Sequence, residues 1–181
     1  MPLYRYHSTG PSIAATAILF PSAVIAGDVT LAEGVNVWHH VTIRGDMAPV
    51  SIGRDTNVQD NVVIHTNVGM PTWIGAAVTI GHGAIIHAAT IHDHALIGMG
   101  SIILDGAVIG EGAMVGAGTL VPPHKNIPPG TLVIGNPMQI VRELTATERQ
   151  DNRDNVGRYL AMAQESLAHL DCHKSCANDE A

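Results

Sequence analysis

The chain has 181 residues, a formal net charge of −7 and 46% hydrophobic residues, but aromatic residues make up only 3%. Its length is that of one domain, and the scarcity of large rings implies a core filled by small branched aliphatic side chains. The negative charge disfavours nucleic acid, which needs a basic surface, and no stretch approaches the roughly 18 uninterrupted apolar residues of a membrane span. We therefore expect neither nucleic acid nor a membrane as a partner.

The N-terminal region and the cysteines indicate the compartment. The apolar run from Ile13 to Ala26 is interrupted by Pro21 and has no basic leader, so it does not have the pattern of a signal peptide. The only cysteines, Cys172 and Cys176, lie close to the C-terminus and provide no disulfide framework. We expect a cytoplasmic protein.

An aliphatic residue recurs every six positions through most of the chain, often with glycine after it. Insertions at 49–51 and 70–73 interrupt the frame, and one later step is a residue shorter. A period of six is the hexapeptide pattern of a parallel β-helix, in which three short strands complete one triangular coil and successive coils stack. The recurring positions are Ile25, Leu31, Val37, Ile43, Ile52, Val58, Ile64, Ile74, Ile80, Ile86, Ile91, Ile97, Ile103, Ile109, Val115 and Val121.

A β-sandwich is the alternative all-β fold for such a sequence. Its strands would come about every 8 to 12 residues with variable turns. The regular six-residue period over nearly a hundred residues excludes it. The period does not determine the handedness of the β-helix.

The C-terminal region departs from the repeat. Residues 131–135 are expected to form a last strand, and Thr145 to Glu148 match a capping box, which predicts a helix start. An apolar stripe at helical spacing is expected from Tyr159, Ala163, Leu167 and Leu170. We therefore divide the chain into a β-helix over 1–135, a connector and C-terminal helix over 136–170, and a flexible tail over 171–181.

Two histidines occupy equivalent places on successive coils. His65 follows Ile64 and His87 follows Ile86, and the gap of 22 residues is one coil of 18 plus four inserted residues. Their side chains should therefore lie about 4.8 Å apart, the spacing of neighbouring strands. Arg44 falls in the same column one coil earlier.

His82 belongs to the preceding step, and therefore to another edge of the triangle. Five strand-like residues separate it from His87, roughly 16 Å at full extension, which is too far for a metal whose bonds to nitrogen are about 2.0–2.1 Å. The histidines converge only if another subunit supplies His82, as in a parallel homotrimer with three equivalent interface sites. The site is then absent from a monomer.

Three neutral imidazoles with an open fourth position are the ligand set of a catalytic zinc ion, which lowers the pKa of bound water to about 7. A single histidine on a repeat scaffold is more often an ordinary surface residue. Because three histidines register into facing columns here, we favour a metal site formed by His65, His82 and His87.

Several segments together resemble the γ-class carbonic anhydrase family: Arg44-Gly-Asp46, Asn57-Val-Gln59-Asp60-Asn61, His65, Gly81-His82 and His87. The runs at 98–106 and 134–137 resemble the compact bacterial branch of that family, and the similarity extends from Ile13 to Tyr159. This resemblance implies an all-β fold, a left-handed parallel β-helix with a C-terminal α-helix packed on its side. It also implies a homotrimer with zinc, or iron or cobalt, at each interface.

The resemblance further implies roles for individual residues. His65 and His87 bind the metal from one subunit and His82 binds it from the next. Gln59 orients the metal-bound hydroxide, and Tyr159 of the C-terminal helix lines the pocket. Ion pairs at the interface are expected from Arg44, Asp46 and Asp60.

The implied reaction converts CO₂ and water into bicarbonate and a proton, so a proton shuttle must regenerate the hydroxide. The archaeal archetype of the family carries shuttle glutamates in an acidic loop after its first histidine. The matching segment here, Thr66 to Thr72, is short and has no carboxylate, and Met47 replaces another acidic position. Either another group relays protons or turnover is slow.

Two other functions compete with the hydratase. Acyltransferases that use acyl-CoA are built on the same prism, although they usually employ one histidine as a general base, and fold does not determine function. A catalytically silent homologue that keeps the metal for assembly is the second alternative.

Two further clusters are not expected to bind metal, because one lies off both site columns and the other lacks a fixed scaffold. They are His92-Asp93-His94, and the tail residues His169, Cys172, His173 and Cys176.

Overall fold

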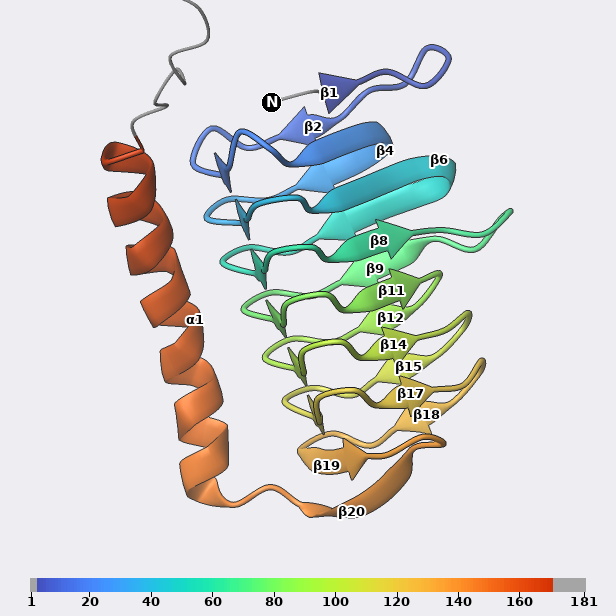
Figure 1. Cartoon of the computed structure of the whole chain (residues 1–181). Helices are drawn as coiled ribbons and strands as arrows, with labels where there is room; N and C mark the ends of the chain where they lie inside the picture. Colours follow the sequence, from blue (N-terminus) through green and yellow to red (C-terminus); the bar gives the residue numbers. More distant parts are fainter. Residues whose placement is uncertain (1–2, 171–181) are drawn as a thin grey trace, which may run out of the picture.

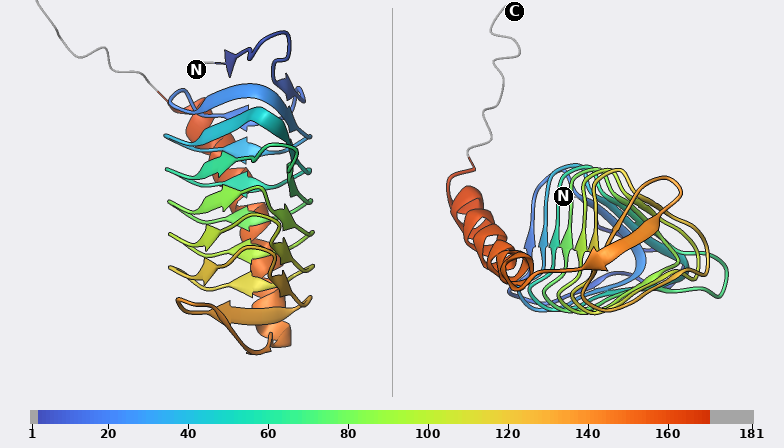
Figure 2. Two further views of the ribbon diagram at one scale, coloured as in Figure 1. Left: turned by 90° about the vertical axis from the view of Figure 1, so that its right-hand side faces the viewer. Right: turned by 90° about the horizontal axis from the view of Figure 1, so that it is seen from below.

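The computed structural model describes residues 3–170. They form a left-handed parallel β-helix, a stack of triangular coils, with one long helix lying beside the stack (Figure 1). Viewed along the stack, the coils superimpose on one another and the helix lies outside the triangle (Figure 2). The predicted fold class is therefore confirmed.

The strands lie on three faces, and consecutive strands on a face belong to successive coils. The first face holds β1 (Leu3–Tyr4), the first half of β4 (Val24–Leu31), the first half of β6 (Thr42–Ile52), β8 (Val63–His65), β11 (Ile85–His87), β14 (Ile102–Ile103) and β17 (Leu120–Val121). The second face holds β2 (Ser12–Ile13), the second halves of β4 and β6, β9 (Thr72–Ile74), β12 (Thr90–Ile91), β15 (Val108–Ile109) and β18 (Asn126–Ile127). The third face holds β3 (Ile18–Leu19), β5 (Asn36–Val37), β7 (Asn57–Val58), β10 (Thr79–Ile80), β13 (Leu96–Ile97), β16 (Met114–Val115), β19 (Thr131–Ile134) and the antiparallel β20 (Gln139–Glu143).

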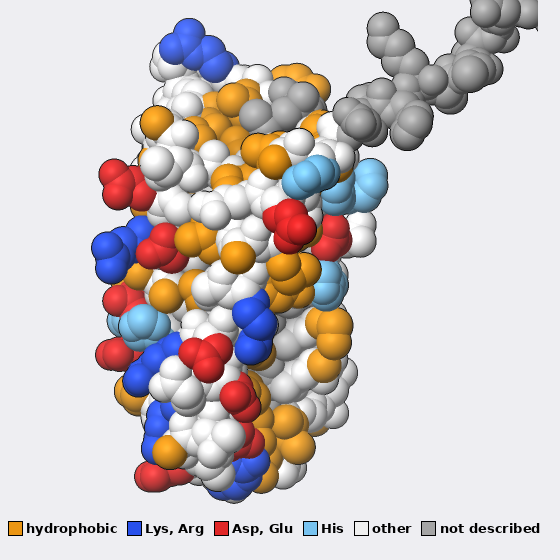
Figure 3. Space-filling view, turned by 90° about the vertical axis from the view of Figure 1, so that its left-hand side faces the viewer, with side chains coloured by type: hydrophobic (Ala, Val, Ile, Leu, Met, Phe, Trp, Pro, Cys, Tyr) orange, Lys and Arg blue, Asp and Glu red, His pale blue; other side chains and the backbone are white. Residues whose placement is uncertain are grey.

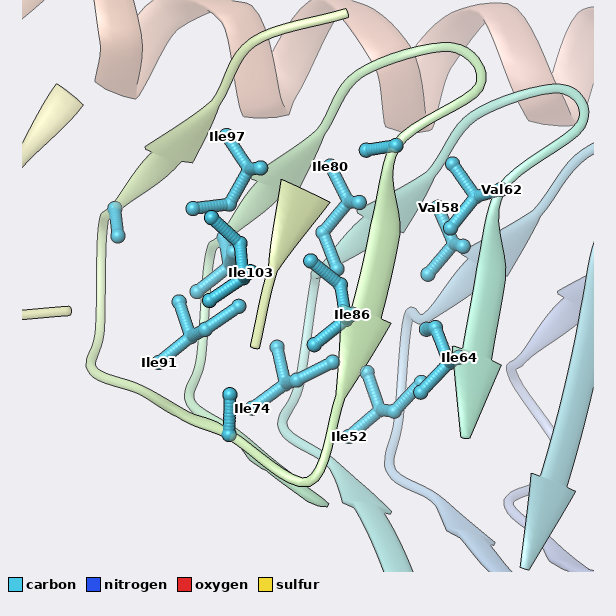
Figure 4. Close-up of a cluster of buried hydrophobic side chains, with 14 of the residues drawn as sticks. Ile52, Val58, Val62, Ile64, Ile74, Ile80, Ile86, Ile91, Ile97 and Ile103 are labelled. Atoms are coloured by element: carbon cyan, nitrogen blue, oxygen red, sulfur yellow. The ribbon is translucent and has the colours of Figure 1, made fainter. Parts of the chain in front are cut away.

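The predicted aliphatic positions fill the interior of the prism. All of them are at most 2% exposed, and each lies directly above its counterpart in the coil below. Ile43 pairs with Ile64, Ile64 with Ile86, and Ile86 with Ile103. Figure 4 shows these side chains pointing to the axis from all three faces. The six-residue period is therefore the period of the core.

The two insertions leave the stacking intact. The pairing of β4 with β6 shifts between Gly27 and Val29, where β6 accommodates the extra residues while turning the corner between two faces. The second insertion forms a tight turn in which Asn67 and Met70 exchange backbone hydrogen bonds of 2.9 and 3.2 Å. Both insertions occur at corners, so the columns above them keep the register counted from the sequence.

The C-terminal helix α1 (Ala146–Ala168) packs along the third face. Thr145 is its N-cap and forms the predicted capping box with Glu148. The helix contacts β3, β5, β7 and β10. The Phe20 ring stacks on Trp38 with ring centroids 4.7 Å apart, and Tyr159 of α1 meets Trp38 edge-on, with ring centroids 5.7 Å apart. These few aromatic rings therefore fasten the helix to the prism.

The predicted apolar stripe of α1 is wrong in its second half. Leu167 and Leu170 are 44% and 41% exposed, and the helix ends at Ala168. The residues buried against the prism are Asn152, Val156 and Ala163. The last turn of α1 lies beside the first coil near Ile18, where little of the prism remains to cover a leucine.

The connector contains a strand that the sequence did not reveal. β20 pairs antiparallel with β19 and closes the C-terminal end of the third face. All five of its residues are exposed, so it has no hydrophobic alternation that could have identified it. The predicted tail over 171–181, with Cys172, His173 and Cys176, lies outside the described residues.

The outer surface on the helix side carries positive and negative side chains intermixed with apolar ones (Figure 3). Within residues 3–170, no helix has both the length and the apolar character needed to cross a bilayer. The cytoplasmic location stays a prediction.

The start of α1 should be acid-sensitive. The Arg142 guanidinium donates two hydrogen bonds of 2.8 Å to the Glu148 carboxylate, which also accepts from the backbone and side chain of Thr145. These contacts, that of Arg142 above all, lower the pKa of Glu148 to about 2 from an ordinary value of 4.5. A depressed pKa means that the stabilisation is complete above about pH 4.5 and is lost as pH falls through about 2.

We therefore expect Glu148→Gln to lower the thermal midpoint of the helical circular dichroism signal at pH 6. This difference from wild type should shrink towards pH 2. Glu143→Gln removes an exposed carboxylate that makes no side-chain hydrogen bond or ion pair within residues 3–170, and serves as the control. A difference between wild type and Glu148→Gln that is the same at both pH values would contradict the assignment.

Candidate metal centre

The first half of the site is a pair of stacked histidines. His65 ends β8 and His87 ends β11, and the two are directly paired in the sheet. The His65 Nδ1 and His87 Nε2 atoms lie 3.2 Å apart. Two nitrogen ligands of one tetrahedral zinc ion are separated by about 3.3 Å, given bonds of about 2.0–2.1 Å. The spacing of the pair therefore fits a shared metal ion.

A carboxylate holds the far side of each ring. Asp46 Oδ1 lies 2.9 Å from His65 Nε2, and Asp105 Oδ1 contacts His87 Nδ1. Arg44 binds the other oxygen of Asp46 from a half-exposed position. Metal-binding histidines commonly donate their second N–H to a carboxylate, which fixes the tautomer and orients the ring. Both rings therefore have the surroundings of metal ligands.

The protons on this chain of groups can be counted. Three contacts run from Asp46 through His65 and His87 to Asp105, so three hydrogen bonds require three protons on the two rings. Two neutral imidazoles carry only two N–H protons. If both rings donate to their carboxylates, two lone pairs face each other across 3.2 Å. A cation between these nitrogens, either a proton or a metal ion, removes that repulsion.

Both carboxylates are set up to remain ionised. Burial pushes the pKa of Asp46 upward, but the hydrogen bond from His65, a backbone hydrogen bond and the charge of Arg44 outweigh burial and leave it below its ordinary value. The pKa of Asp105 is lowered chiefly by the hydrogen bond from His87 and then by that from Asn67. Two anionic groups behind the histidines favour a cation in front of them.

The second half of the site surrounds His82. This residue lies in the turn before β11, between Gly81 and Gly83, and Gly83 has the left-handed φ of +68° that a glycine adopts without strain. His82 Nδ1 lies 2.9 Å from Asp60 Oδ2, and its backbone N–H donates to Gln59 Oε1 at 3.2 Å. The side chain of His82 is 42% exposed, and its Nε2 atom lies 3.5 Å from the Tyr159 hydroxyl.

Gln59 belongs to a buried chain of amides and hydroxyls. Its Nε2 donates to Asn57 Oδ1 at 3.1 Å, and Asn57 in turn donates to Thr79 Oγ1 at 2.9 Å. Asn155 of α1 donates to the same hydroxyl at 3.2 Å. This network couples Gln59 to the helix and leaves the second proton of its Nε2 free to bind another group.

A cavity of about 350 Å³ opens beside His82. Gln59 and Tyr159 line it together with apolar residues, among them Met99 and Met114. The Tyr159 hydroxyl lies 3.5 Å from His82 Nε2, and burial, followed by the charge of Asp60, raises its pKa. Tyr159 therefore remains protonated at neutral pH and can donate a hydrogen bond into the cavity.

The structure places the predicted residues in two groups on different edges of the prism. His65 and His87 lie with Arg44 and Asp46, whereas His82 lies with Asp60, Gln59 and Tyr159. Within residues 3–170, no three potential ligands of one chain meet around a common point. A shared site across subunits, and ion pairs across an interface, stay predictions.

Sequence reasoning missed Asp105 and its partner Asn67. Asp105 lies two residues after the inward Ile103, which pairs with Ile86 beside His87. Because one step of this coil is a residue shorter, counting places Leu104 and not Asp105 in the position equivalent to His87. The second contact, from Asn67 Nδ2 to Asp105 Oδ2 at 2.7 Å, spans 38 residues and depends on the fold of the inserted turn. In the His92-Asp93-His94 cluster, Asp93 accepts from the Ala76 backbone N–H.

A stack of hexapeptide coils with histidines held by carboxylates at its edges defines a hexapeptide-repeat protein with a candidate metal centre. Residues 88–123 match the family described as bacterial transferase hexapeptide (six repeats). A carbonic anhydrase from Geobacillus kaustophilus is 44% identical over 176 residues, which cover 97% of each chain. The chain therefore belongs to the γ-class carbonic anhydrase-like family.

Two further similarities are informative. A probable carbonic anhydrase from Methanocaldococcus jannaschii is 46% identical over 142 residues, 78% of this chain and 89% of that protein. The crystal structure of a putative acetyltransferase from Bacillus cereus has a TM-score of 0.92 and 43% identity, covering 93% of this chain and 98% of that one. The family is therefore shown, while both kinds of activity occur among the names of its members.

The amide network of Gln59 should contribute to stability. Asn57 is fully buried, and replacing it with leucine removes the acceptor of Gln59 Nε2 and one of the two donors to Thr79 Oγ1. We expect Asn57→Leu to lower the free energy of unfolding by about 1–3 kcal/mol, measured by urea denaturation.

Asn126→Leu provides the control for this substitution. Asn126 also directly precedes an inward aliphatic residue, but it is exposed. Its replacement should change the free energy of unfolding by no more than about 0.5 kcal/mol. Equal effects at the two positions would show that the buried network does not stabilise the fold.

Proposed function

We propose that this protein is a metal-dependent carbonic anhydrase that converts CO₂ and water into bicarbonate and a proton. His65 and His87 of one subunit and His82 of the next would hold Zn²⁺, or Fe²⁺ or Co²⁺, at each interface of a homotrimer. The observation that carries the proposal is the arrangement of the three rings. Each has one nitrogen held by a carboxylate, while the other nitrogen lies opposite the second histidine of the pair or, in His82, beside Tyr159.

A second chain is needed to complete the proposed ligand set, and a homotrimer would supply one at each interface. The two halves of the site lie on different edges of one prism, and His82 is the most exposed of the three histidines. A neighbouring chain in parallel orientation would place its own His82 edge opposite the stacked pair. Three such contacts close a ring and produce three identical sites.

The residues of this chain would divide the work of the reaction. When bound, Zn²⁺ supplies the Lewis acidity that lets water lose a proton near neutral pH. Asp46 and Asp60 hold the rings of His65 and His82. Gln59 offers its free N–H to the attacking oxygen, and the protonated Tyr159 hydroxyl can orient an oxygen of CO₂. The apolar wall of the cavity suits a substrate without charge.

Proton export should depend on the buffer. The turn between β8 and β9 carries no carboxylate, so the proton leaves mainly by direct transfer to a buffer molecule. We expect the turnover number in stopped-flow CO₂ hydration to rise several-fold as an imidazole-type buffer is increased from about 1 to 50 mM. A turnover number that is independent of buffer concentration would instead reveal an efficient internal shuttle.

Removal of His82 provides the central test. His82→Ala should reduce bound metal from about one ion per chain to near zero, and should abolish CO₂ hydration, because two imidazoles do not complete the ligand set. Metal analysis and stopped-flow hydration on a size-verified oligomer measure both quantities. His92→Ala changes a histidine that meets the Trp73 ring edge-on, outside the site, and should alter neither.

An acyltransferase is the second candidate, favoured by the similarity to the putative acetyltransferase from Bacillus cereus and by the apolar cavity beside His82. A metal-free oligomer that consumes acetyl-CoA would replace the hydratase proposal with this one. A metal-loaded oligomer without hydration above buffer background, in both zinc and iron forms, would identify a silent homologue.

A further inference from the structure

Asp105 lies behind the histidine pair and is held from two sides. It follows β14 at the corner of the coil next to that of His87, and its side chain is 25% exposed. Oδ1 contacts His87 Nδ1, while Oδ2 accepts a hydrogen bond of 2.7 Å from Asn67 Nδ2. Each carboxylate oxygen therefore has its own partner, which leaves little freedom for the side chain to turn.

Asn67 is itself fixed by the turn that it begins. Its backbone exchanges hydrogen bonds with Met70, and its side-chain Oδ1 accepts the Val68 N–H at 2.8 Å. On either side of the turn, Thr66 Oγ1 accepts from the Ala48 N–H and Thr72 Oγ1 donates to the His65 carbonyl. The amide nitrogen of Asn67 thus points at Asp105 from a braced position.

We propose that Asp105 and Asn67 are positioning residues for His87, an inference that rests on the proposed metal site. The carboxylate keeps the imidazole proton on Nδ1, and this places the lone pair of Nε2 towards His65, where a metal ion would be shared. Without this acceptor the neutral ring is free to carry its proton on Nε2, the tautomer that water favours, and that proton blocks the metal-binding nitrogen. Asn67 holds the carboxylate at the required angle.

The chain provides a charge-matched control. Glu111 also lies at a corner, two residues after an inward aliphatic side chain as Asp105 does, and loses the same charge on substitution. Its side chain makes no hydrogen bond or ion pair within the part of the chain that the structure describes. A difference between Asp105→Ala and Glu111→Ala therefore reports the contact with His87 and not the net charge.

The first measurement is zinc affinity, by competition with a chromophoric chelator on size-verified protein. We expect Asp105→Ala to bind zinc about 10–100-fold more weakly than wild type, the usual effect of losing such a partner. Asn67→Ala should weaken binding less, and Asp105→Asn should lie near wild type because its amide oxygen still accepts from Nδ1. Glu111→Ala should match wild type.

The second measurement needs no metal. Nitrogen-15 NMR of the metal-free protein at about pH 9, where imidazole is neutral, reports which ring nitrogen of His87 carries the proton. We expect Nδ1–H in wild type and in Glu111→Ala, and a shift to Nε2–H in Asp105→Ala. Asp105→Asn, which keeps the acceptor, should restore the wild-type tautomer.

The outcomes separate this inference from the proposed function. If wild type binds zinc and Asp105→Ala binds it as tightly as Glu111→Ala does, the positioning role is wrong and the metal site stands. If wild type binds no metal, the proposed function fails, and the tautomer of His87 decides the inference alone. An unchanged Nδ1–H tautomer in Asp105→Ala overturns it. Should Asp105→Ala not fold, judged by circular dichroism, Asn67→Ala replaces it in both measurements.

Discussion

The stacking of one coil on the next is the constraint on which the rest of this structure depends. Each inward aliphatic residue lies over its counterpart, and the parallel backbone hydrogen bonds that join the coils keep this register along the prism. An error of one residue would turn every interior side chain to the surface. The outward side chains inherit the same order, so His65 and His87 are aligned because Ile64 and Ile86 are.

The same constraint separates the two halves of the candidate metal centre. A side chain on one edge cannot reach another edge without breaking the coil between them, so His82 remains with Asp60 and Gln59. The prism thereby presents two separate groups of histidines, in which each ring is already held by a carboxylate. In the proposed trimer, metal binding and assembly would be one event, because neither half completes the ligand set.

Sequence reasoning succeeded where a residue's place follows from counting and was incomplete where it follows from packing. The six-residue period predicted the core and both histidine columns. The capping box, a separate local motif, predicted the start of α1. It did not predict that Leu167 and Leu170 would be exposed, since the hydrophobic stripe of a helix does not tell where the surface covering it ends. The contact from Asn67 to Asp105 was also missed, because a turn inserted at a corner has no fixed register.

The sequence by itself determined the β-helix, the family to which the chain belongs and the identity of the candidate ligands. In a strict repeat, the position of a residue in the sequence fixes the coil and the face on which it lies. Only the tertiary structure decided how the ligands are held. It showed which nitrogen of each ring faces a carboxylate, that Asp105 stands behind His87, and that Asn67 holds Asp105 from the other side. Those features arise from corners and turns, where contacts between distant segments depend on side-chain shape.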